Sequence, residues 1–210
     1  MVATPTLQLE RELLDSGIPV VIGVDEVGRG ALAGPVVVGA CAVSLSSGDF
    51  PEGLRDSKLL SPTRRGKLYP QVHEWAAVCL GSAMPDEIDQ FGISYALGLA
   101  GKRALAKLFE RGIDVGASHV ILDGKYDWLT PLLASPLPIT ALIKADESCG
   151  SVAAASVIAK VDRDAHMVQL ATDFPQYHWD SNKGYGSASH IDAIREHGAT
   201  EHHRRSWLSL

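Results

Sequence analysis

Short runs of apolar, β-branched residues alternate along this chain with segments of helical spacing. The apolar runs predict five strands, at residues 20–25, 35–43, 75–82, 120–123 and 139–143. Helical spacing predicts one helix after residue 61 and others over 93–111, 151–170 and 189–197. Three successive strands followed by helix-linked ones predict an α/β fold, in which a mixed five-stranded sheet is flanked by helices.

Local signals mark where several of these helices begin and end. Ser61 followed by Pro62 is typical of an N-cap and the first helical residue. Gly112 and Gly198 each follow a helical segment and predict its C-terminal end. The helix over 151–170 is rich in small residues, which predicts close packing against the sheet.

Composition excludes several classes of protein. Hydrophobic residues make up 46% of the 210 positions and charged residues 21%, so extensive disorder is excluded. The longest apolar stretch, residues 31–43, is interrupted by Gly and Pro and is shorter than the roughly 20 residues of a membrane-spanning helix. The N-terminus has no signal-peptide pattern, and the three cysteines form no CxxC motif. We therefore expect a soluble cytoplasmic protein.

Charge is distributed unevenly along the chain. The formal net charge is −6, yet residues 54–70 carry a local charge of +4 and residues 95–111 one of +3. The C-terminal region adds four basic residues and four histidines: Lys183, Arg195, Arg204, Arg205, His190, His197, His202 and His203. These regions either form a face that follows phosphates or are ordinary solvated surface. The candidate phosphate contacts are Lys58, Arg64, Arg65, Lys183 and Arg204.

Acidic residues recur where strands are predicted to end. Asp25 and Glu26 follow the first strand, Asp123 ends the fourth, and Asp146 comes shortly after the fifth. Neighbouring side chains of a strand point to opposite faces, so Asp25 and Glu26 share a site only if the strand ends there and Glu26 lies in a turn. Carboxylates grouped in this way are typical of a site for Mg²⁺ or a similar cation.

The glycines after Glu26 raise the alternative of a dinucleotide site. Gly28, Gly30 and Gly34 have a spacing that misses the G-x-G-x-x-G pattern by one residue. A strand follows them, whereas a dinucleotide site requires a helix N-terminus at that point. The pattern therefore excludes a dinucleotide-binding function.

The acidic residues belong to a series of motifs that covers most of the chain. In chain order the motifs are Gly23-Val24-Asp25-Glu26-Val27-Gly28-Arg29-Gly30, Gly34-Pro35-Val36-Val37, Asp56-Ser57-Lys58-Leu59-Leu60, Leu122-Asp123-Gly124, Lys144-Ala145-Asp146, Ala154-Ala155-Ser156-Val157-Ile158-Ala159-Lys160, Arg163-Asp164, Asn182-Lys183-Gly184-Tyr185-Gly186 and His203-Arg204-Arg205-Ser206-Trp207. Together they resemble type 2 ribonuclease H, and most closely the bacterial ribonuclease HII family.

This resemblance implies an RNase H-like fold with a C-terminal helical extension. It divides the chain into an N-terminal segment (1–17), a catalytic domain (18–170) and an extension (171–210) that contributes to substrate binding. The implied activity is that of a metal-dependent endoribonuclease that hydrolyses RNA in RNA–DNA hybrids. It also cleaves 5′ of single ribonucleotides in duplex DNA, leaving 3′-hydroxyl and 5′-phosphate ends, as ribonucleotide removal in DNA replication and repair requires. The expected partners are these nucleic acids, with no membrane, and the expected state is a monomer.

The resemblance also assigns residues to roles. The implied metal-binding catalytic carboxylates, which would hold Mg²⁺ or Mn²⁺ in a two-metal mechanism, are Asp25, Glu26, Asp123 and Asp146. The implied substrate-binding residues are Gly28, Arg29, Gly30, Asp56, Ser57, Lys58, Lys183, Tyr185 and Arg204. Among them the segment 28–30 matches a loop that reads the ribose 2′-hydroxyl, and Tyr185 matches a tyrosine that packs on the neighbouring deoxyribose.

Three positions depart from the family pattern. Ala145 replaces a usual glycine, Asp162 stands where an apolar or aromatic residue is common, and Trp207 replaces a usual phenylalanine. Because Ala145 precedes Asp146, Glu147 stays an alternative to Asp146 as the fourth ligand.

Two other functions fit these residues less well than that of a nuclease. A binding module that keeps the fold without cleaving is disfavoured, because all four carboxylates are present. A glycosidase needs two carboxyls on opposite sides of a sugar, and only 6% of the residues here are aromatic.

Overall fold

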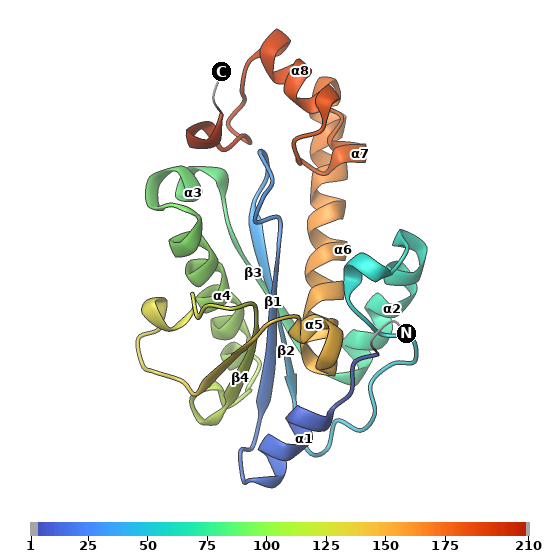
Figure 1. Cartoon of the computed structure of the whole chain (residues 1–210), viewed down its shortest axis with the longest axis vertical. Helices are drawn as coiled ribbons and strands as arrows, with labels where there is room; N and C mark the ends of the chain where they lie inside the picture. The colour runs from blue at the N-terminus through green and yellow to red at the C-terminus, as the bar shows by residue number, and fades with distance from the viewer. Residues whose placement is uncertain (1–3, 209–210) are drawn as a thin grey trace.

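A mixed five-stranded sheet forms the centre of the molecule (Figure 1). The computed structural model describes residues 4–208. The strands are β1 (Val21–Val27), β2 (Val36–Val43), β3 (Ala77–Ala83), β4 (His119–Asp123) and β5 (Ile139–Leu142), in the spatial order β3-β2-β1-β4-β5. The central strand β1 pairs antiparallel with β2 and parallel with β4. This confirms the predicted α/β fold and its mixed sheet.

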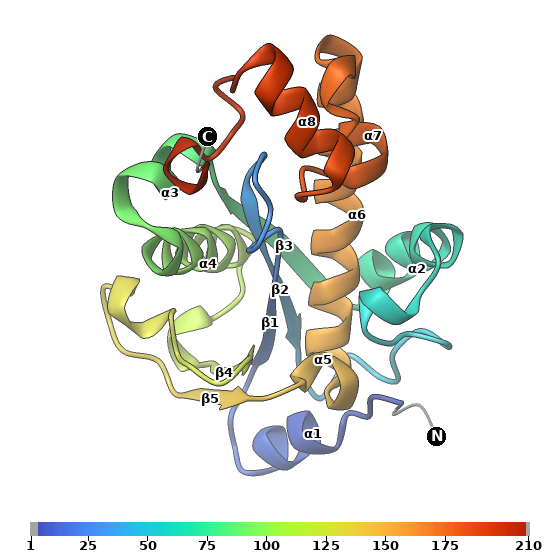
Figure 2. The same cartoon turned by 45° about the horizontal axis from the view of Figure 1, so that its top comes forward.

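Helices cover both faces of this sheet. They are α1 (Gln8–Asp15), α2 (Pro62–Trp75), α3 (Pro85–Phe91), α4 (Ile93–Glu110), α5 (Ala145–Ser148), α6 (Gly150–Asp173), α7 (Trp179–Asn182) and α8 (Ala188–His197). Figure 2 shows α4 and α6 on opposite sides of the sheet. The apolar residues of α4 form one core cluster with one face of the sheet, and those of α6 form another with the opposite face. No helix within residues 4–208 is long and apolar enough to cross a membrane.

Small residues bring α6 close to the sheet, as the sequence predicts. A Cβ atom on Gly23 of β1 would lie 2.4 Å from the backbone nitrogen of Val152. A Cβ atom on Gly39 of β2 would lie 2.3 Å from the carbonyl oxygen of Ala155. Any side chain at either glycine would therefore push α6 off the sheet.

The predicted boundaries differ from the observed ones in a few places. β1 continues two residues past the predicted end at Asp25, because Glu26 and Val27 still pair with β2. β3 begins at Ala77, since α2 continues through Trp75. The short helices α1, α3, α5 and α7 were not predicted, because four to eight residues carry too little periodicity. Helix α6 runs through residue 170, the predicted boundary of the extension.

Basic residues of α4 and of its C-cap, Arg111, protect the exposed edge of the sheet. Strand β3 lies at this edge, and its backbone carbonyls at Ser82, Leu80 and Val78 accept hydrogen bonds from Arg103, Lys107 and Arg111 at 2.7, 2.8 and 2.9 Å. An edge strand with free carbonyls can pair with another chain, so these contacts oppose aggregation. Much of the charge in region 95–111 therefore serves the fold, which favours the solvated-surface reading of that region over a phosphate face.

The N-terminal helix α1 is joined to the start of α6 by one buried carboxylate. Glu10 is 1% exposed, and its Oε1 accepts hydrogen bonds from the backbone N–H and the hydroxyl of Ser151 at 2.9 and 2.7 Å. A carboxylate is stabilising at a helix N-terminus, where backbone N–H groups lack partners. Glu10 thus fixes the end of the helix that covers the sheet.

The C-terminal region forms a third core cluster against the second half of α6. His190 and His203 are buried there, with their Nε2 atoms 3.2 Å apart. His190 Nε2 also accepts from Trp179 Nε1–H, and its Nδ1 lies 2.9 Å from the carbonyl oxygen of Tyr185. These two histidines make internal polar contacts and therefore belong neither to a phosphate-binding face nor to solvated surface.

Candidate active site

Two adjacent carboxylates lie at the end of β1. Asp25 is 3% exposed, and its Oδ1 accepts a hydrogen bond from the Glu26 backbone N–H at 2.8 Å. Alternation places Asp25 on the sheet face that α6 covers and Glu26 on the face that α4 covers. The condition set for a shared site, that Glu26 lies in a turn, is not met, because Glu26 still pairs with Val38. Glu26 therefore approaches from the other face of the strand, at the point where the sheet ends.

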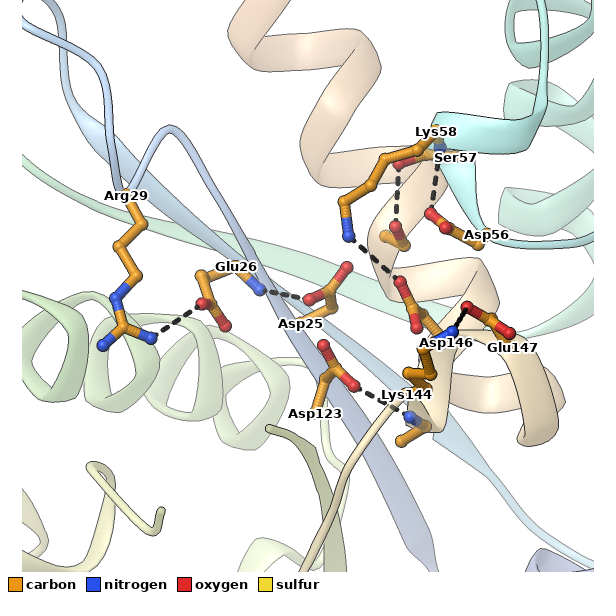
Figure 3. Close-up of polar contacts among 12 residues, drawn as sticks. Asp25, Glu26, Arg29, Asp56, Ser57, Lys58, Asp123, Lys144, Asp146 and Glu147 are labelled. Atoms are coloured by element: carbon orange, nitrogen blue, oxygen red, sulfur yellow. Dashed lines mark hydrogen bonds and ion pairs between the residues drawn. The ribbon is translucent and has the colours of Figure 1, made fainter. Parts of the chain in front are cut away.

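Two further carboxylates approach Asp25 from the neighbouring chain segments. Strand β4 runs parallel to β1 with Val24 opposite Leu122, so Asp25 and Asp123 come next at the same level. Asp123 Oδ1 accepts a hydrogen bond from the Ala145 backbone N–H at 2.8 Å, which holds α5 beside β4. Asp146, in α5, is 3% exposed. Figure 3 shows the side chains of Asp25, Glu26, Asp123 and Asp146 gathered around one region.

One lysine reaches into this group of carboxylates. Lys58 Nζ lies 3.3 Å from Asp146 Oδ2 (Figure 3). The lysine is positioned by Asp56, whose Oδ1 accepts from the Lys58 backbone N–H at 2.9 Å. Glu147, the alternative fourth carboxylate, pairs instead with Lys144 at 2.8 Å. The contacts therefore favour Asp146 over Glu147 as the member of the group.

Burial and mutual repulsion oppose the ionisation of these four carboxyl groups. Burial raises the pKa of Asp25 well above its usual value, and the charges of Glu26, Asp123 and Asp146 raise it further. The pKa values of Glu26, Asp123 and Asp146 are also raised, chiefly by burial. Arg29 and Lys58 oppose this effect at Glu26 and Asp146. Their two positive charges are fewer than the four carboxylates, so the group as a whole favours additional cations.

The donor chemistry of the group fits a hard divalent cation. All its donors are oxygens, and Glu26 Oε2 is buried without a hydrogen-bond partner. Within residues 4–208, no three Asp, Glu, His or Cys side chains already stand at the mutual distances of a closed metal site. The carboxylates would have to draw together around a cation, as expected for like charges that otherwise repel.

A short loop follows the two carboxylates of β1. Gly28 has φ +82°, which only glycine adopts readily, and a Cβ atom there would lie 2.1 Å from Arg163 Nε. The Arg29 side chain turns back to Glu26, with Nη1 and Oε1 3.4 Å apart. Nothing lies within 4 Å of the position that a Gly30 Cβ would occupy. The loop thus presents open backbone beside the carboxylates.

Most of the predicted site residues line one cavity of about 220 Å³, but Asp56, Asp146, Lys183 and Arg204 do not. Its walls include Asp25, Glu26, Gly28, Arg29, Gly30, Ser57, Lys58, Asp123 and Tyr185. A larger cavity of about 430 Å³ adjoins it and shares Arg29 and Asp123. We place the chemistry in the smaller cavity, because it contains three of the four carboxylates. Residues from β1, β4, η1 (Ser57–Leu59) and the segment after α7 therefore meet in one place, although they are far apart in sequence.

Comparison with known proteins decides the family. The family model of ribonuclease HII matches residues 22–210. The ribonuclease HII of Streptomyces griseus is 47% identical over 211 residues, which cover 98% of this chain and 85% of the relative. The chain belongs to the ribonuclease HII family. As a member, it is an endoribonuclease that hydrolyses RNA in RNA–DNA hybrids.

Solved structures agree with this ribonuclease HII fold. The enzyme in the structure of the PCNA:RNase HII complex from Archaeoglobus fulgidus has a TM-score of 0.70 and 24% sequence identity, over 91% of this chain and 96% of that one. Bst-RNase HIII in complex with Mn²⁺ has a TM-score of 0.67 and 24% identity, over 86% of this chain and 63% of that one. At these identities the likeness shows the fold.

Two arginines of this ribonuclease HII chain do not lie where the sequence suggested. Arg204 was expected to contact substrate, but it is completely buried and donates to the carbonyls of Gly28, Arg29 and Gly34. Arg65 was a candidate phosphate contact, but it is 9% exposed and donates to the carbonyls of Ser57 and Leu60. Both expectations are wrong, because these guanidiniums are buried and donate to backbone oxygens inside the protein.

The remaining substrate-binding candidates differ in their access to the cavity. Tyr185 is 37% exposed and the Lys58 side chain is 71% exposed, so both are accessible from the open site. Asp56 is buried and does not line the cavity; its contact is with the Lys58 backbone. Lys183 has φ 52°, and its Nζ donates to the carbonyl of Asp180, outside the cavity walls.

Sequence reasoning gave no role to two residues that the site includes. Lys160 of α6 lines the cavity, with its Nζ 6.0 Å from the Tyr185 ring. Arg163, one turn further along α6, lies directly against the loop at Gly28. Both lie in motifs that the family resemblance rests on, and their i, i+3 spacing places them on one side of a helix. That spacing was the available signal.

Proposed function

We propose that this ribonuclease HII cleaves duplex DNA 5′ of single embedded ribonucleotides as well as RNA–DNA hybrids, leaving 3′-hydroxyl and 5′-phosphate ends. The observation that carries the proposal is the convergence of Asp25, Glu26, Asp123 and Asp146 beside an open glycine loop. Hydrolysis of a phosphodiester requires positive charge at the reacting phosphate, which cations held by these carboxylates would supply. The loop would contact the sugar attached to that phosphate.

The four carboxylates would hold Mg²⁺ or Mn²⁺. When bound, two such cations activate water and stabilise the leaving oxygen of a phosphodiester. The raised pKa values of all four carboxylates support this role, because a cation would relieve the repulsion that raises them. The structure of Bst-RNase HIII with Mn²⁺ supports it by analogy of fold.

The loop over 28–30 would recognise the ribose 2′-hydroxyl through its backbone. A hydroxyl accepts as well as donates hydrogen bonds, so backbone N–H groups of the loop would bind it, whereas the carbonyls of Gly28 and Arg29 already accept from Arg204. The open space at Gly30 supports this role, because a sugar needs that volume. Arg29 would contribute positive charge, since 55% of its side chain is exposed.

Tyr185, Lys58 and Lys183 would bind the substrate on either side of the reacting phosphate. Tyr185 offers an exposed ring that can pack on a sugar, with two cationic side chains near its ring. Lys58 Nζ would exchange part of its contact with Asp146 for a phosphate oxygen. The positive charges of Lys58 and Lys183 would offset the repulsion between the phosphates and the carboxylates around the site.

A cleavage assay with matched variants tests this proposal. We expect wild-type protein to cut a duplex with one ribonucleotide only when Mg²⁺ or Mn²⁺ is added. Asp25→Asn and Asp123→Asn should each lower the rate by at least about a thousandfold, because an amide cannot replace a carboxylate as a cation ligand. The control Asp192→Asn, at an exposed position of α8, should cleave like wild type. Cleavage without added metal, or near-normal rates for the first two variants, would overturn the proposal.

A further inference from the structure

Arg163 of α6 joins two segments that the proposed function assigns to substrate recognition. Its Nε donates to the carbonyl of Pro35 at 2.9 Å and its Nη2 to that of Ala33 at 3.1 Å. Its Nη1 donates to the carbonyl of Lys183 at 2.9 Å. One guanidinium therefore binds both the loop after β1 and the turn that carries Tyr185.

The surroundings of Arg163 leave it little freedom. The residue is 1% exposed and makes no ion pair with any carboxylate among the described residues. Gly28 lies directly against it, since a Cβ there would come within 2.1 Å of Nε. Above it, the ring of Tyr185 lies 5.4 Å from the guanidinium carbon, a distance at which a cation and an aromatic ring attract.

The same two segments also contact each other directly. The backbone N–H groups of Leu32 and Ala33 both donate to the carbonyl of Gly184, at 2.8 and 3.1 Å. A Cβ atom on Gly184 would lie 2.4 Å from the carbonyl oxygen of Ala33, so the segments touch through backbone alone. The two segments are therefore joined both by direct backbone hydrogen bonds and through the guanidinium of Arg163.

We infer that Arg163 is a positioning residue that sets the distance between the ribose-reading loop and Tyr185, and so determines preference for a single ribonucleotide. This inference rests on the proposed function. At a single ribonucleotide only one register places the ribose on the loop and the deoxyribose on Tyr185. A continuous hybrid offers many registers, so it tolerates an error in this distance.

Arg163→Lys tests the inference, because lysine keeps the charge but cannot bind three carbonyls from one planar group. We expect kcat/KM for a duplex with one ribonucleotide to fall about tenfold more than for a continuous hybrid of the same sequence. The double variant Arg163→Lys/Tyr185→Ala should show the same substrate ratio as Tyr185→Ala alone, since the arginine acts through the tyrosine. Arg195→Lys, an exposed arginine of α8, is the matched control and should leave the ratio unchanged.

A binding measurement separates this inference from the proposed chemistry. In EDTA, the affinity of wild-type protein for a duplex with one ribonucleotide should exceed that for all-DNA duplex, and Arg163→Lys should reduce this excess. If Arg163→Lys does not fold, Arg163→Gln replaces it, because the neutral amide loses the three-carbonyl contact without burying an unpaired charge. Equal losses on both substrates, with an unchanged binding excess in the folded variant, would overturn the inference. Failure of wild type to cut single ribonucleotides, with the binding excess still sensitive to Arg163, would instead overturn the proposed cleavage alone.

Discussion

Arg204 binds the backbone of Gly28 across 176 residues of sequence, with Nη2 2.6 Å from the carbonyl oxygen. The same side chain also donates to the carbonyls of Arg29 and Gly34, and it is completely buried. Burial lowers the pKa of this guanidinium to about 9, so it stays charged at neutral pH. A basic residue near the chain end thus shapes the loop beside the carboxylates, instead of contacting nucleic acid itself.

This arrangement predicts a large difference between two adjacent arginines. Arg204→Lys should lower the free energy of unfolding by about 3 kcal/mol, because several buried carbonyls lose charged donors. Arg205→Lys, at an exposed position, should change it by less than about 0.5 kcal/mol. Urea unfolding of both variants measures the difference. Equal effects would show that the Arg204 contacts contribute nothing specific to stability.

The salt dependence of binding should separate exposed from buried basic residues. Each phosphate that the protein neutralises adds about 0.9 to the slope of log affinity against log salt for B-form DNA. Arg64→Ala and Lys183→Ala should each reduce that slope, because both are candidate phosphate contacts and neither residue is buried. Fluorescence anisotropy in EDTA, across a salt series, measures it, with Arg195→Ala as the control.

Arg65→Ala gives the opposite expectation in the same titration. Its guanidinium donates to the carbonyls of Ser57 and Leu60, so its loss should reduce stability and leave the slope unchanged. A slope that falls with Arg65→Ala but not with Arg64→Ala would contradict the placement of the positive charge.

His203 should contribute a loss of stability in mild acid, opposite in sign to the four site carboxylates, whose raised pKa values favour the folded state as the pH falls. Burial, with the positive charges of neighbouring groups, lowers the pKa of His203 to about 4, from an ordinary value of about 6.5. The unfolded chain then binds a proton that the folded chain excludes between pH 6.5 and 4. Stability from this group is fully present above pH 6.5 and is lost as the pH falls toward 4, at up to about 1.4 kcal/mol per pH unit.

Urea unfolding at pH 7.5, 6 and 5 tests this prediction. His203→Gln removes the titrating group and should make stability fall less than in wild type between pH 7.5 and 5, although the variant is less stable at pH 7.5. His73→Gln, at an exposed position of α2, should keep the wild-type dependence. An unchanged slope in His203→Gln would assign the acid sensitivity to other groups.

Local signals predicted much of this fold. Ser61 caps α2 by accepting from the Arg64 backbone N–H, with Pro62 at the first helical position, as the sequence indicates. Gly112 and Gly198 have φ +85° and +79° after the helices they end. These features depend on residues a few positions apart, which a sequence displays directly.

The errors concern contacts between distant residues. The runs of basic residues suggested a phosphate-binding face. Instead, Arg103, Lys107 and Arg111 donate to backbone carbonyls at the edge of β3. Their spacing of four residues does not reveal that partner. Arg204 likewise binds a loop that lies far away in sequence. Glu26 belongs to β1 because it pairs with Val38 of β2. The glycines that follow Glu26 suggested that the strand ends earlier. Such contacts are fixed by the packing of the whole sheet.

The most direct test of the central claim is the chemical identity of the product ends. A duplex with one ribonucleotide is cut with Mg²⁺ under single-turnover conditions, and both fragments are measured by mass spectrometry. Attack by water at a phosphate held among Asp25, Glu26, Asp123 and Asp146 predicts a 3′-hydroxyl on the upstream fragment and a 5′-phosphate on the ribonucleotide. A 2′,3′-cyclic phosphate would mean that the ribose hydroxyl itself attacks, and would contradict the account.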